Sequence, residues 1–377
     1  MKNVDFTCIT ARSMPFWCVG SCLSDPFGGP VLERLDSAQV AELIAWAGRE
    51  GLIEASSFHD DDLVPWNPDD PEDDLDQASP VSTKLRTIKK ILDGAGVHVH
   101  AATCSLHGDR LFRNGGLCNP DAAIRALAAK KVERTLRIGH FLGAKYFVYW
   151  VARDGFEVPG ITDWANVYHW LAEGLNHVTD YIQSQKLDNY IGASVEPKPN
   201  EPRGQMFLPT SGHAAGFILS MLNEKHFWGV NPELLQHESM ALMNASMTLA
   251  YLCSMNKLKF LHFGSQIKAQ FDNDFPPLTG PEGLKETAYL FHTLKKMGWQ
   301  GVCEFDCHML RTEGDIDDPI KCRKQFIVNC VTALAMALEL AGRIPDLSPI
   351  QYSQTKADLE ATRKMCALDD VAIRRTS

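Results

Sequence analysis

The sequence predicts an α/β protein in which eight parallel strands, each followed by a helix, close into a barrel. Apolar, strand-like runs alternate with amphipathic helical stretches eight times along the chain. No glycine-rich phosphate loop follows an early strand, as a doubly wound open sheet would require. The length of 377 residues is ordinary for a barrel with insertions. We therefore expect a barrel domain at residues 1–343 and a C-terminal arm at 344–377.

The expected strands and helices follow one another in order. The strand-like runs lie at Pro15–Val19, Leu52–Ser57, Val97–Thr103, Tyr146–Trp150, Tyr190–Glu196, Phe227–Glu233, Leu258–His262 and Val302–Asp306. The helical patterns lie at Ala38–Arg49, Ser82–Ala95, Asp121–Leu142, Trp164–Gln185, Gly212–Leu222, Glu238–Met255, Pro281–Met297 and Pro319–Ala341.

Three stretches fall outside this alternation. Asn67–Gln77 is acidic and contains prolines, so we expect an exposed loop with solvated charges. Asp25–Pro30 is a turn that carries Phe27, for which the pattern offers no role. The polar tail after Gly342 is expected to be either a disordered terminus or an arm that packs on a neighbouring subunit.

Composition and charge exclude several classes of partner. A net charge of −10 argues against nucleic acid. No apolar run approaches the ~18 residues of a membrane span and the first residues lack a signal-peptide core, so we expect a cytoplasmic protein without a membrane partner. The eleven cysteines have no framework spacing and are interpreted as mostly buried free thiols in a reducing compartment.

The stretch ASVEPKPNEPRG, residues 193–204, carries the first chemical signal. An apolar run ends in Glu196, and prolines at 197, 199 and 202 forbid a helix after it. Glu196 and Lys198 therefore lie on one side of a stiff extended segment, where they could bind a metal ion and polarise a carbonyl. Taken alone, the same residues would equally suit a surface turn with a chance ion pair.

The ends of the expected strands extend this signal, because reactive groups of such barrels lie where strands end. Trp17, the loop from His59 to Asp62, Thr103 and Trp150 end or follow the first four strands. The last four strands end in groups that could bind a metal ion, namely Glu196, Glu233, His262 and Asp306. His59 with Asp62 would form an oriented imidazole that moves a proton, although Asp60–Asp62 could instead cap a helix. Trp17 and Trp150 would either wall the pocket or serve ordinary packing.

Further candidate ligands follow two of these strands. His237 lies four residues after Glu233, and Asp272 and Asp274 alternate in the loop after the seventh strand. With five carboxylates beside two imidazoles, the cavity would hold too many negative groups without cations, so we expect two divalent ions per subunit. Oxygen ligands favour Mg²⁺ or Mn²⁺, whereas the imidazoles favour Mn²⁺, Co²⁺, Fe²⁺ or Zn²⁺.

These motifs, in order, resemble those of xylose isomerase, the enzyme also used as glucose isomerase, in its shorter class. The resemblance rests on VEPKPNEPRG, FHDDDLVP, WGVNPE with a following HE, FDND, and FD with a following RTE, and extends from about Pro15 to Leu340. It implies a metal-dependent aldose–ketose isomerase that shifts a hydride between C2 and C1 of an open-chain sugar or related polyol. The family's subunits form oligomers, which implies a homo-oligomer here, a dimer or a tetramer.

The resemblance also implies roles for individual residues. Ligands of the first ion would be Glu196, Glu233 and Asp306, and those of the second Glu233, His237, Asp272 and Asp274. Lys198 would bind the carbonyl end of the substrate, and His59 with Asp62 would assist ring opening. The wall of the sugar pocket would include Trp17, Thr103 and Trp150. The loop DPFGG would place Phe27 in the active site of a neighbouring subunit.

The chain departs from the family pattern inside the site. His262 stands where the family has an aspartate ligand of the first ion, and an imidazole favours softer metals such as Fe²⁺ or Zn²⁺. His308 replaces a lysine, and His107 replaces a phenylalanine of the sugar pocket. Other departures are Ser21 for a tryptophan, Val151–Ala152 for two glycines, and one extra residue between Glu233 and His237.

Three functions remain open from the sequence. The first is an aldose–ketose isomerase acting on xylose, glucose or a related polyol. The second is a diverged enzyme on the same scaffold, such as an epimerase, a lyase or an Fe/Mn-dependent enzyme, which the pocket histidines favour. The third is a metal-bound interaction protein without activity, which the intact His59, Asp62 and Lys198 disfavour.

Overall fold

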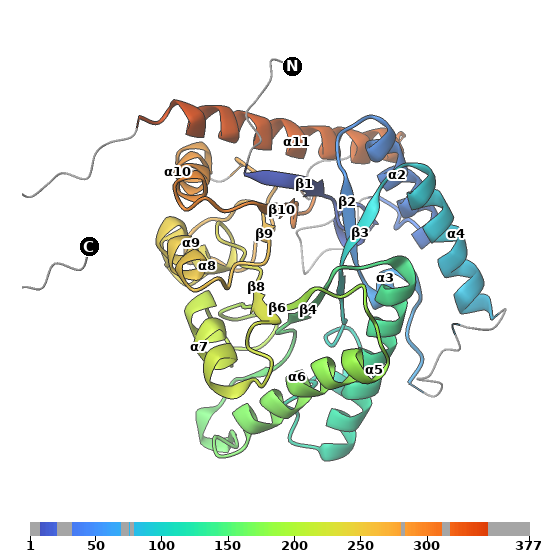
Figure 1. Ribbon diagram of the computed structural model, residues 1–377, viewed down its shortest axis with the longest axis vertical. Coiled ribbons are helices and arrows are strands. Elements are labelled where there is room, and N and C mark those ends of the chain that lie inside the picture. Colours follow the sequence, from blue (N-terminus) through green and yellow to red (C-terminus); the bar gives the residue numbers. More distant parts are fainter. Residues whose placement is uncertain are drawn as a thin grey trace, which may run out of the picture. The chain divides into compact units, whose positions relative to one another are not determined.

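The computed structural model describes residues 8–20, 32–68, 75, 79–279, 283–310 and 317–345. Eight parallel strands form one sheet in the order β8-β6-β4-β3-β2-β1-β10-β9. Isolated parallel bridges from Val230 to Leu258 and from Glu233 to His262 connect the two ends of this order, so the sheet curls round on itself. The predicted barrel is confirmed (Figure 1). Its strands are β1 Ile9–Ser13, β2 Ala55–His59, β3 His98–Thr103, β4 Tyr146–Trp150, β6 Gly192–Glu196, β8 Trp228–Val230, β9 Leu261–His262 and β10 Gly301–Glu304.

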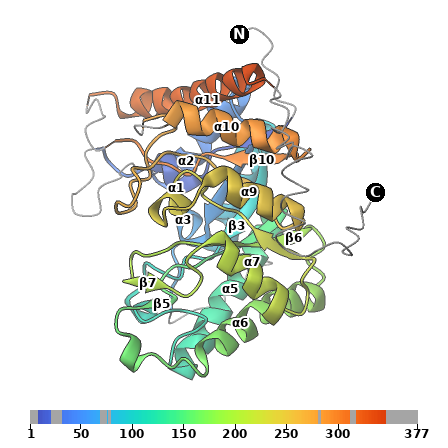
Figure 2. The same cartoon turned by 90° about the vertical axis from the view of Figure 1, so that its left-hand side faces the viewer.

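Helices cover the outside of the strands (Figures 1 and 2). Side chains cap several of their first turns: Asp36 accepts hydrogen bonds from the backbone of Ala38 and Gln39, and Ser79, Asp121 and Thr210 cap later helices. The helices that follow the barrel strands are α2 Ser37–Arg49, α4 Pro80–Gly94, α5 Ala122–Leu142, α6 Val167–Ser184, α7 Ser211–Met221, α9 Ala245–Ser254, α10 Gly283–Lys296 and α11 Pro319–Arg343.

Shorter elements lie between the strands and these helices. They are α1 Phe16–Gly20, α3 Asp60–Leu63, α8 His237–Met240, the 3₁₀ helices η1 Arg110–Phe112 and η2 Pro159–Ile161, and strands β5 Gly155–Phe156 and β7 Gln205–Met206. β5 and β7 form a separate antiparallel pair, which Figure 2 shows apart from the barrel strands. This pair joins the loop after β4 to the loop after β6.

The predicted first strand, Pro15–Val19, is wrong. Phe16–Gly20 is the helix α1, and the strand is Ile9–Ser13. Pro15 has no N–H to donate to a ladder, and its fixed φ suits the start of a helix. Ile9, Ala11 and Ser13 are buried at alternate positions, which is the period of a strand. Trp17 consequently lies in α1, just after β1, rather than at a strand end.

The predicted helix Glu238–Met255 is two helices, α8 and α9. Leu242 adopts a positive φ of 58°, which ends α8. Asn244 then begins α9, because its side chain accepts a hydrogen bond from the backbone N–H of Met247 at 2.9 Å. His237, the first residue of α8, lines the cavity described below.

A large apolar core packs strands against helices, and a smaller apolar cluster lies inside the barrel. Ala101, Val148 and Phe260 form the interior cluster, with Tyr146 and Val302 packed against it. By length and composition α11 could cross a membrane, but 56% of its apolar stretch is buried within the protein, as in the core helix of a globular fold. The nine cysteines among the described residues are all free thiols, and seven are buried, as predicted.

Several predictions concern residues that the structure does not describe. The residues outside the described ranges are the turn Asp25–Pro30 with Phe27, the departure at Ser21, most of Asn67–Gln77 and the tail beyond Pro345. Their proposed roles remain predictions.

Candidate metal centre

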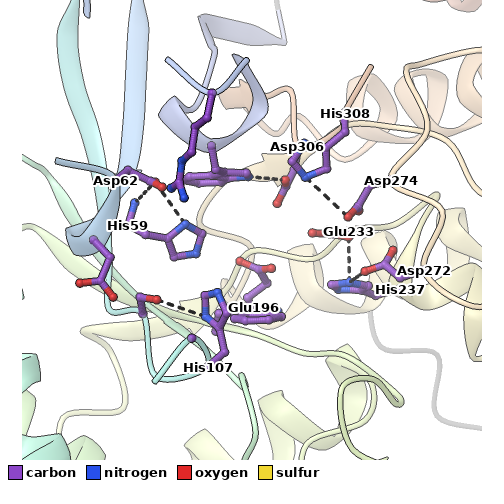
Figure 3. Close-up of a pocket in the computed structure, with 16 residues that line it drawn as sticks. His59, Asp62, His107, Glu196, Glu233, His237, Asp272, Asp274, Asp306 and His308 are labelled. Carbon is purple, nitrogen blue, oxygen red and sulfur yellow. Dashed lines mark hydrogen bonds and ion pairs between the residues drawn. The ribbon is translucent and has the colours of Figure 1, made fainter. Parts of the chain in front are cut away.

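A cavity of about 420 Å³ lies at the carboxyl ends of the barrel strands (Figure 3). Its walls combine two tryptophans, four histidines and seven acidic residues with an arginine, a serine and a glycine. The lining residues are Trp17, Arg34, His59, Asp61, Asp62, Ser105, His107, Gly108, Trp150, Glu196, Glu233, His237, Asp272, Asp274, Asp306 and His308. This is where a parallel barrel places its active site.

The first cluster consists of four buried residues, Glu196, Glu233, His262 and Asp306. One ligand atom from each lies within 4.8 Å of the others. His262 Nδ1 lies 2.9 Å from Asp306 Oδ2, 3.4 Å from Glu233 Oε1 and 3.7 Å from Glu196 Oε2. Three carboxylates and one imidazole around one point form a ligand set for a divalent cation.

Strand pairing brings these four residues together although they are far apart in the chain. Glu196 ends β6, where it pairs with Trp150 of β4, and His262 ends β9. Glu233 forms a parallel bridge with His262 in the loop after β8. Asp306 follows β10 by two residues, and its carboxylate accepts a hydrogen bond from Trp17 Nε1 at 2.7 Å.

The second cluster consists of Glu233, His237 and Asp272, and shares Glu233 with the first. His237 Nδ1 lies 3.0 Å from the carbonyl oxygen of Pro197, to which it donates its hydrogen. The other ring nitrogen, Nε2, lies 3.1 Å from Glu233 Oε2 and 3.4 Å from Asp272 Oδ2. An imidazole nitrogen and two carboxylates that converge on one point fit a second divalent ion.

Two buried oxygens in this cluster support the same fit. Among the described residues, Glu233 Oε2 and Asp272 Oδ1 receive no hydrogen bond of good geometry. Leaving a buried carboxylate oxygen unpaired is costly, and a metal ion is an ordinary partner for such an oxygen.

Asp274 lies beside the second cluster but outside its set of converging atoms. Its backbone has a positive φ of 44°. Gln236 Nε2 donates to Asp274 Oδ1 at 3.2 Å and to the carbonyl oxygen of Asp306 at 2.6 Å. Gln236, which lies between Glu233 and His237, thus connects Asp274 to the backbone after β10.

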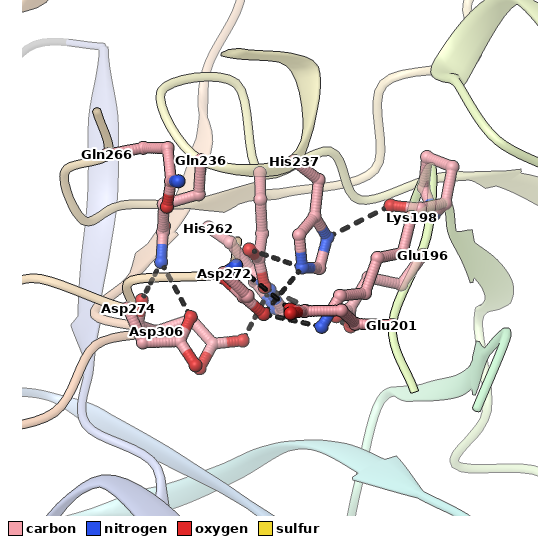
Figure 4. A network of polar contacts seen from close by, with 12 residues as sticks. Glu196, Lys198, Glu201, Gln236, His237, His262, Gln266, Asp272, Asp274 and Asp306 are labelled. Carbon is pink, nitrogen blue, oxygen red and sulfur yellow. Dashed lines mark hydrogen bonds and ion pairs between the residues drawn. The ribbon is translucent and has the colours of Figure 1, made fainter. Parts of the chain in front are cut away.

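Lys198 and Glu201 hold Asp272 from the loop after β6, as Figure 4 shows. Lys198 Nζ lies 2.5 Å from Asp272 Oδ2, and Glu201 Oε2 accepts a hydrogen bond from the backbone N–H of Asp272 at 2.9 Å. The Lys198 ammonium also lies 5.7 Å from the centre of the Trp150 ring. Burial would lower the pKa of Lys198, but the charge of Asp272 outweighs it and raises the pKa, so Lys198 stays cationic.

The pKa values of the three carboxyl groups in the first cluster are shifted in different directions. Burial raises the pKa of Glu196, and burial together with Asp306 raises the pKa of Glu233 well above its ordinary range. Burial opposes ionisation of Asp306 as well, but the nearby His262 holds the pKa of Asp306 below its usual range. Carboxyl groups that resist ionisation when crowded lose their protons readily to a cation, so binding of a metal ion would release protons.

Aromatic rings and imidazoles form the opposite wall of the cavity. The His59 ring lies 4.4 Å from the Trp17 ring and 5.6 Å from the His107 ring, measured between centroids. His107 packs edge-on against Trp150 at 4.8 Å. Burial, followed by the nearby His59, lowers the pKa of His107 to about 3, so His107 is neutral at physiological pH.

His59 and Asp62 form the expected pair. Asp62 Oδ2 accepts a hydrogen bond from the backbone N–H of His59 at 2.8 Å and lies 3.4 Å from its ring Nδ1. Burial would lower the pKa of His59, but the hydrogen bond and charge of Asp62 outweigh it, so the pKa is raised. The imidazole is therefore oriented and able to carry a proton near neutral pH.

A buried ionic network beneath His59 was not anticipated from the sequence. Asp60 is fully buried and accepts hydrogen bonds from Lys131 Nζ at 2.8 Å, Arg134 Nη1 at 3.1 Å and the backbone of Ser105 at 2.8 Å. Lys131 also binds Asp61 at 2.9 Å. The run of three aspartates after β2 was a signal for it, since one of them points inward and needs cationic partners.

The remaining predicted residues lie in different surroundings. Thr103 is buried at the end of β3, paired with His59 in register, and does not line the cavity. His308 lines the cavity, and its backbone N–H donates to the carbonyl oxygen of Asp274 at 2.7 Å. Val151 is 1% exposed and packs in the core, away from the cavity. Sequence reasoning missed Arg34, Asp61 and Ser105, which do line it.

A parallel barrel that gathers buried carboxylates and imidazoles at its strand ends is the architecture of a metal-binding barrel enzyme. Comparison with known proteins agrees. Residues 57–325 match the family model described as xylose isomerase-like TIM barrel. The chain is 36% identical over 299 residues to a protein named xylose isomerase from Thermus thermophilus, covering 79% of this chain and 73% of that protein.

Solved structures of related fold support the architecture. The chain is similar to L-ribulose 3-epimerase, with a TM-score of 0.61 and 13% identity over 90% of this chain and 99% of that one. It is also similar to D-psicose 3-epimerase, with a TM-score of 0.59 and 16% identity over 88% and 100%. The protein belongs to the xylose isomerase-like TIM barrel family. The resemblance inferred from the motifs is confirmed.

Proposed function

We propose that the protein is a divalent-metal-dependent aldose–ketose isomerase that acts on an open-chain sugar or a related polyol. The observation that carries the proposal is the pair of clusters joined by Glu233, next to a buried lysine and an oriented histidine. The relative from Thermus thermophilus, which is named xylose isomerase, supports this reaction. Two ions at these clusters would act as Lewis acids that stabilise negative charge on the sugar oxygens.

The residues around the clusters have distinct tasks in this proposal. Lys198 is cationic and lies against Asp272, from where it can donate a hydrogen bond to the carbonyl oxygen of the open-chain sugar. Glu201 accepts a hydrogen bond from the backbone N–H of Asp272. This contact keeps the Asp272 carboxylate in place when Lys198 turns to the substrate. Trp17 and Trp150 line the cavity and exclude water from the carbon atoms between which a hydride moves.

His59 would act at the ring-opening step. Its imidazole has a raised pKa and is oriented by Asp62, so it can deliver a proton to, and take one from, the ring oxygen and the anomeric hydroxyl of a cyclic sugar. His107 is neutral and stands 5.6 Å from His59, which makes it a hydrogen-bond partner for sugar hydroxyls rather than a source of charge.

Turnover after metal removal and restoration tests this proposal. The chelated protein is expected to lose activity on xylose or glucose, and Mg²⁺, Mn²⁺ or Co²⁺ is expected to restore it. Fe²⁺ and Zn²⁺ are included because His262 adds an imidazole to the first cluster. Absence of ketose product with every metal and both sugars would refute the proposed isomerase.

A diverged sugar enzyme is the second candidate, and His262 and His107 are the observations that favour it. An imidazole in the first cluster and another in the pocket alter both the metal and the polar contacts available to a substrate. An epimerase would act on a ketose at C3, and a lyase or an Fe/Mn-dependent enzyme would act on another compound. Incubation with ketoses and separation of the products distinguishes an epimerised ketose from an aldose.

A homo-oligomer in the cytoplasm is part of the same proposal. The motif DPFGG implies that Phe27 reaches the active site of a neighbouring subunit. Sedimentation at low protein concentration measures the assembly: a dimer or a tetramer agrees with this role, and a monomer contradicts it.

A further inference from the structure

Glu304 is a buried carboxylate that neither metal cluster includes. It is the last residue of β10, where it pairs in register with Ser13 of β1 and with His262 of β9. Residues paired directly on neighbouring parallel strands point to the same face, so these three side chains share one layer of the barrel interior. Glu304 is 1% exposed, and a charge so buried requires partners.

The partners of Glu304 are the two side chains of its own layer. Its Oε2 accepts a hydrogen bond from Ser13 Oγ. Its Oε1 lies 3.3 Å from His262 Nε2, the ring nitrogen on the opposite side from the metal cluster. Both carboxyl oxygens of Glu304 therefore face a side chain that can donate a hydrogen bond.

This contact determines which nitrogen of His262 carries hydrogen. A carboxylate oxygen next to an unprotonated Nε2 would place two lone pairs against each other, whereas Nε2–H donates to it. Asn231 Nδ2 also lies 3.2 Å from Nε2, and this amide, which has two hydrogens, donates one of them to Glu196 Oε2 at 3.1 Å. We assign a hydrogen on Nε2 to the bond with Glu304, because a carboxylate oxygen has no hydrogen to donate.

We propose that Glu304 is a positioning residue that holds His262 in the Nε2–H tautomer, so that the Nδ1 lone pair faces the metal ion. Nδ1 is the atom that lies 2.9–3.7 Å from Asp306, Glu233 and Glu196. The carboxylate fixes the ring orientation and makes Nδ1 more basic, as outer carboxylates do for other metal-bound histidines. This inference rests on the proposed metal site.

The substitution at position 262 explains why such a residue is needed. An aspartate ligand, as in the family pattern, has no tautomers and offers oxygen in either orientation. An imidazole offers a lone pair on only one nitrogen, and the choice of nitrogen must be made by its surroundings. Ser13 in turn orients Glu304, so β1, β9 and β10 each contribute one side chain to this chain of contacts.

Mn²⁺ affinity of the chelated protein, measured by calorimetry or by electron paramagnetic resonance of free Mn²⁺, tests the proposal. Glu304→Leu is expected to weaken binding at the first cluster by about 10- to 100-fold. Glu304→Gln is expected to restore part of it, because its amide oxygen still accepts from Nε2–H. Asp154→Asn is the matched control, since Asp154 is a buried carboxylate held by Gly116 N–H and Tyr149 outside the metal clusters. It is expected to leave Mn²⁺ affinity unchanged.

A double-variant cycle separates positioning from a general structural effect. In the His262→Asp background, Glu304→Gln is expected to change Mn²⁺ affinity by less than about twofold, because no tautomer remains to be held. An equal loss in both backgrounds would overturn the proposal, as would unchanged Mn²⁺ affinity in a folded Glu304→Leu protein.

The tautomer itself is observed by nitrogen NMR of ¹⁵N-histidine-labelled protein with Zn²⁺ added. The resonance of His262 is assigned from its absence in the His262→Asp variant. Hydrogen on Nε2 agrees with the proposal, and hydrogen on Nδ1 contradicts it. A wild-type protein that binds no metal ion at all would instead refute the proposed function, so the two failures are distinguishable.

Discussion

The two metal clusters differ in the part of the fold that holds them. The first is held by strand ends and the residues directly after them, and its members are buried and paired through the ladder of the sheet. The second takes Glu233 from the first, but His237 comes from the short helix α8 and Asp272 from the loop after β9. A barrel therefore provides one rigid set of ligands and one set that depends on loops.

This difference shows how each set stays in place. Register fixes the first, since a strand shifted by one residue would turn its ligands away from the cavity. The second relies on contacts made by loops, with Lys198 and Glu201 holding Asp272 and the carbonyl oxygen of Pro197 holding His237. We expect the first set to bind its ion more tightly and the second to respond more to substitutions in loops.

Glu233→Gln breaks both sets at once and should have the largest effect. Glu233 is the one residue common to the two clusters, so an uncharged side chain weakens both ions. Turnover is expected to fall at least about a thousandfold, the upper end for loss of one main electrostatic group. Glu286→Gln, which removes only a surface ion pair with Lys268, is the control. Metal content after dialysis and turnover with saturating Mn²⁺ are measured, and near-normal values of both would contradict the shared ligand.

Lys198→Ala should abolish turnover while the fold stays intact. The variant removes the cation that faces Asp272 and the proposed donor to the substrate carbonyl, and a loss of about 100- to 1,000-fold in kcat is expected. Lys89→Ala, an exposed lysine paired with Asp93 on α4, should leave kcat unchanged. Circular dichroism checks the fold. A Lys198→Ala enzyme with ordinary kcat would remove Lys198 from the chemistry.

Asp272→Asn should distinguish the two sets directly. The substitution removes the charge of Asp272, which belongs to the second cluster and is the partner of Lys198. The first cluster does not include Asp272. Titration with Mn²⁺ is expected to show the weaker of two sites weakened at least about tenfold and the tighter one nearly unchanged. Equal weakening of both sites would mean that the clusters are not independent.

His262→Asp should change the preferred metal of the first set. Replacing an imidazole with a carboxylate makes the set all-oxygen, which favours Mg²⁺ over softer ions. We expect the Mg²⁺-to-Mn²⁺ affinity ratio to rise about tenfold, measured by competition between the two ions. An unchanged ratio would show that His262 does not contact the ion.

Asp62→Asn should have the smallest effect, visible as a change in pH dependence. Asp62 raises the pKa of His59 above its unfolded value, so this pair stabilises the fold at pH values below the unfolded pKa of about 6.5. That contribution is lost as pH rises through the folded pKa. Urea unfolding of both proteins should therefore differ more in acid than in alkali, and a difference that grows with pH would contradict the pairing.

Most of the barrel could be predicted because strand and helix periodicity are local. β4 is predicted to the residue, and Glu196, His262 and Asp306, chosen as candidate ligands from their places at strand ends, do converge on one point. The first strand was missed because Phe16–Gly20 is as apolar as a strand, and only Pro15 marked the boundary. The break in the helix after Glu238 was missed because a positive φ at Leu242 has no signature in a non-glycine residue.

The sequence by itself determined which chemical groups reach the mouth of the barrel. The end of a strand is set by the few residues before and after it, so a local pattern identifies the residue that lies there. Tertiary structure alone decided which atoms meet: Lys198 with Asp272, Gln236 with Asp274, and Glu304 with His262. Those contacts join residues 38–74 positions apart, and their distances follow from strand register and from loops folded over the closed sheet. Register is a property of pairs of strands, which no local pattern contains.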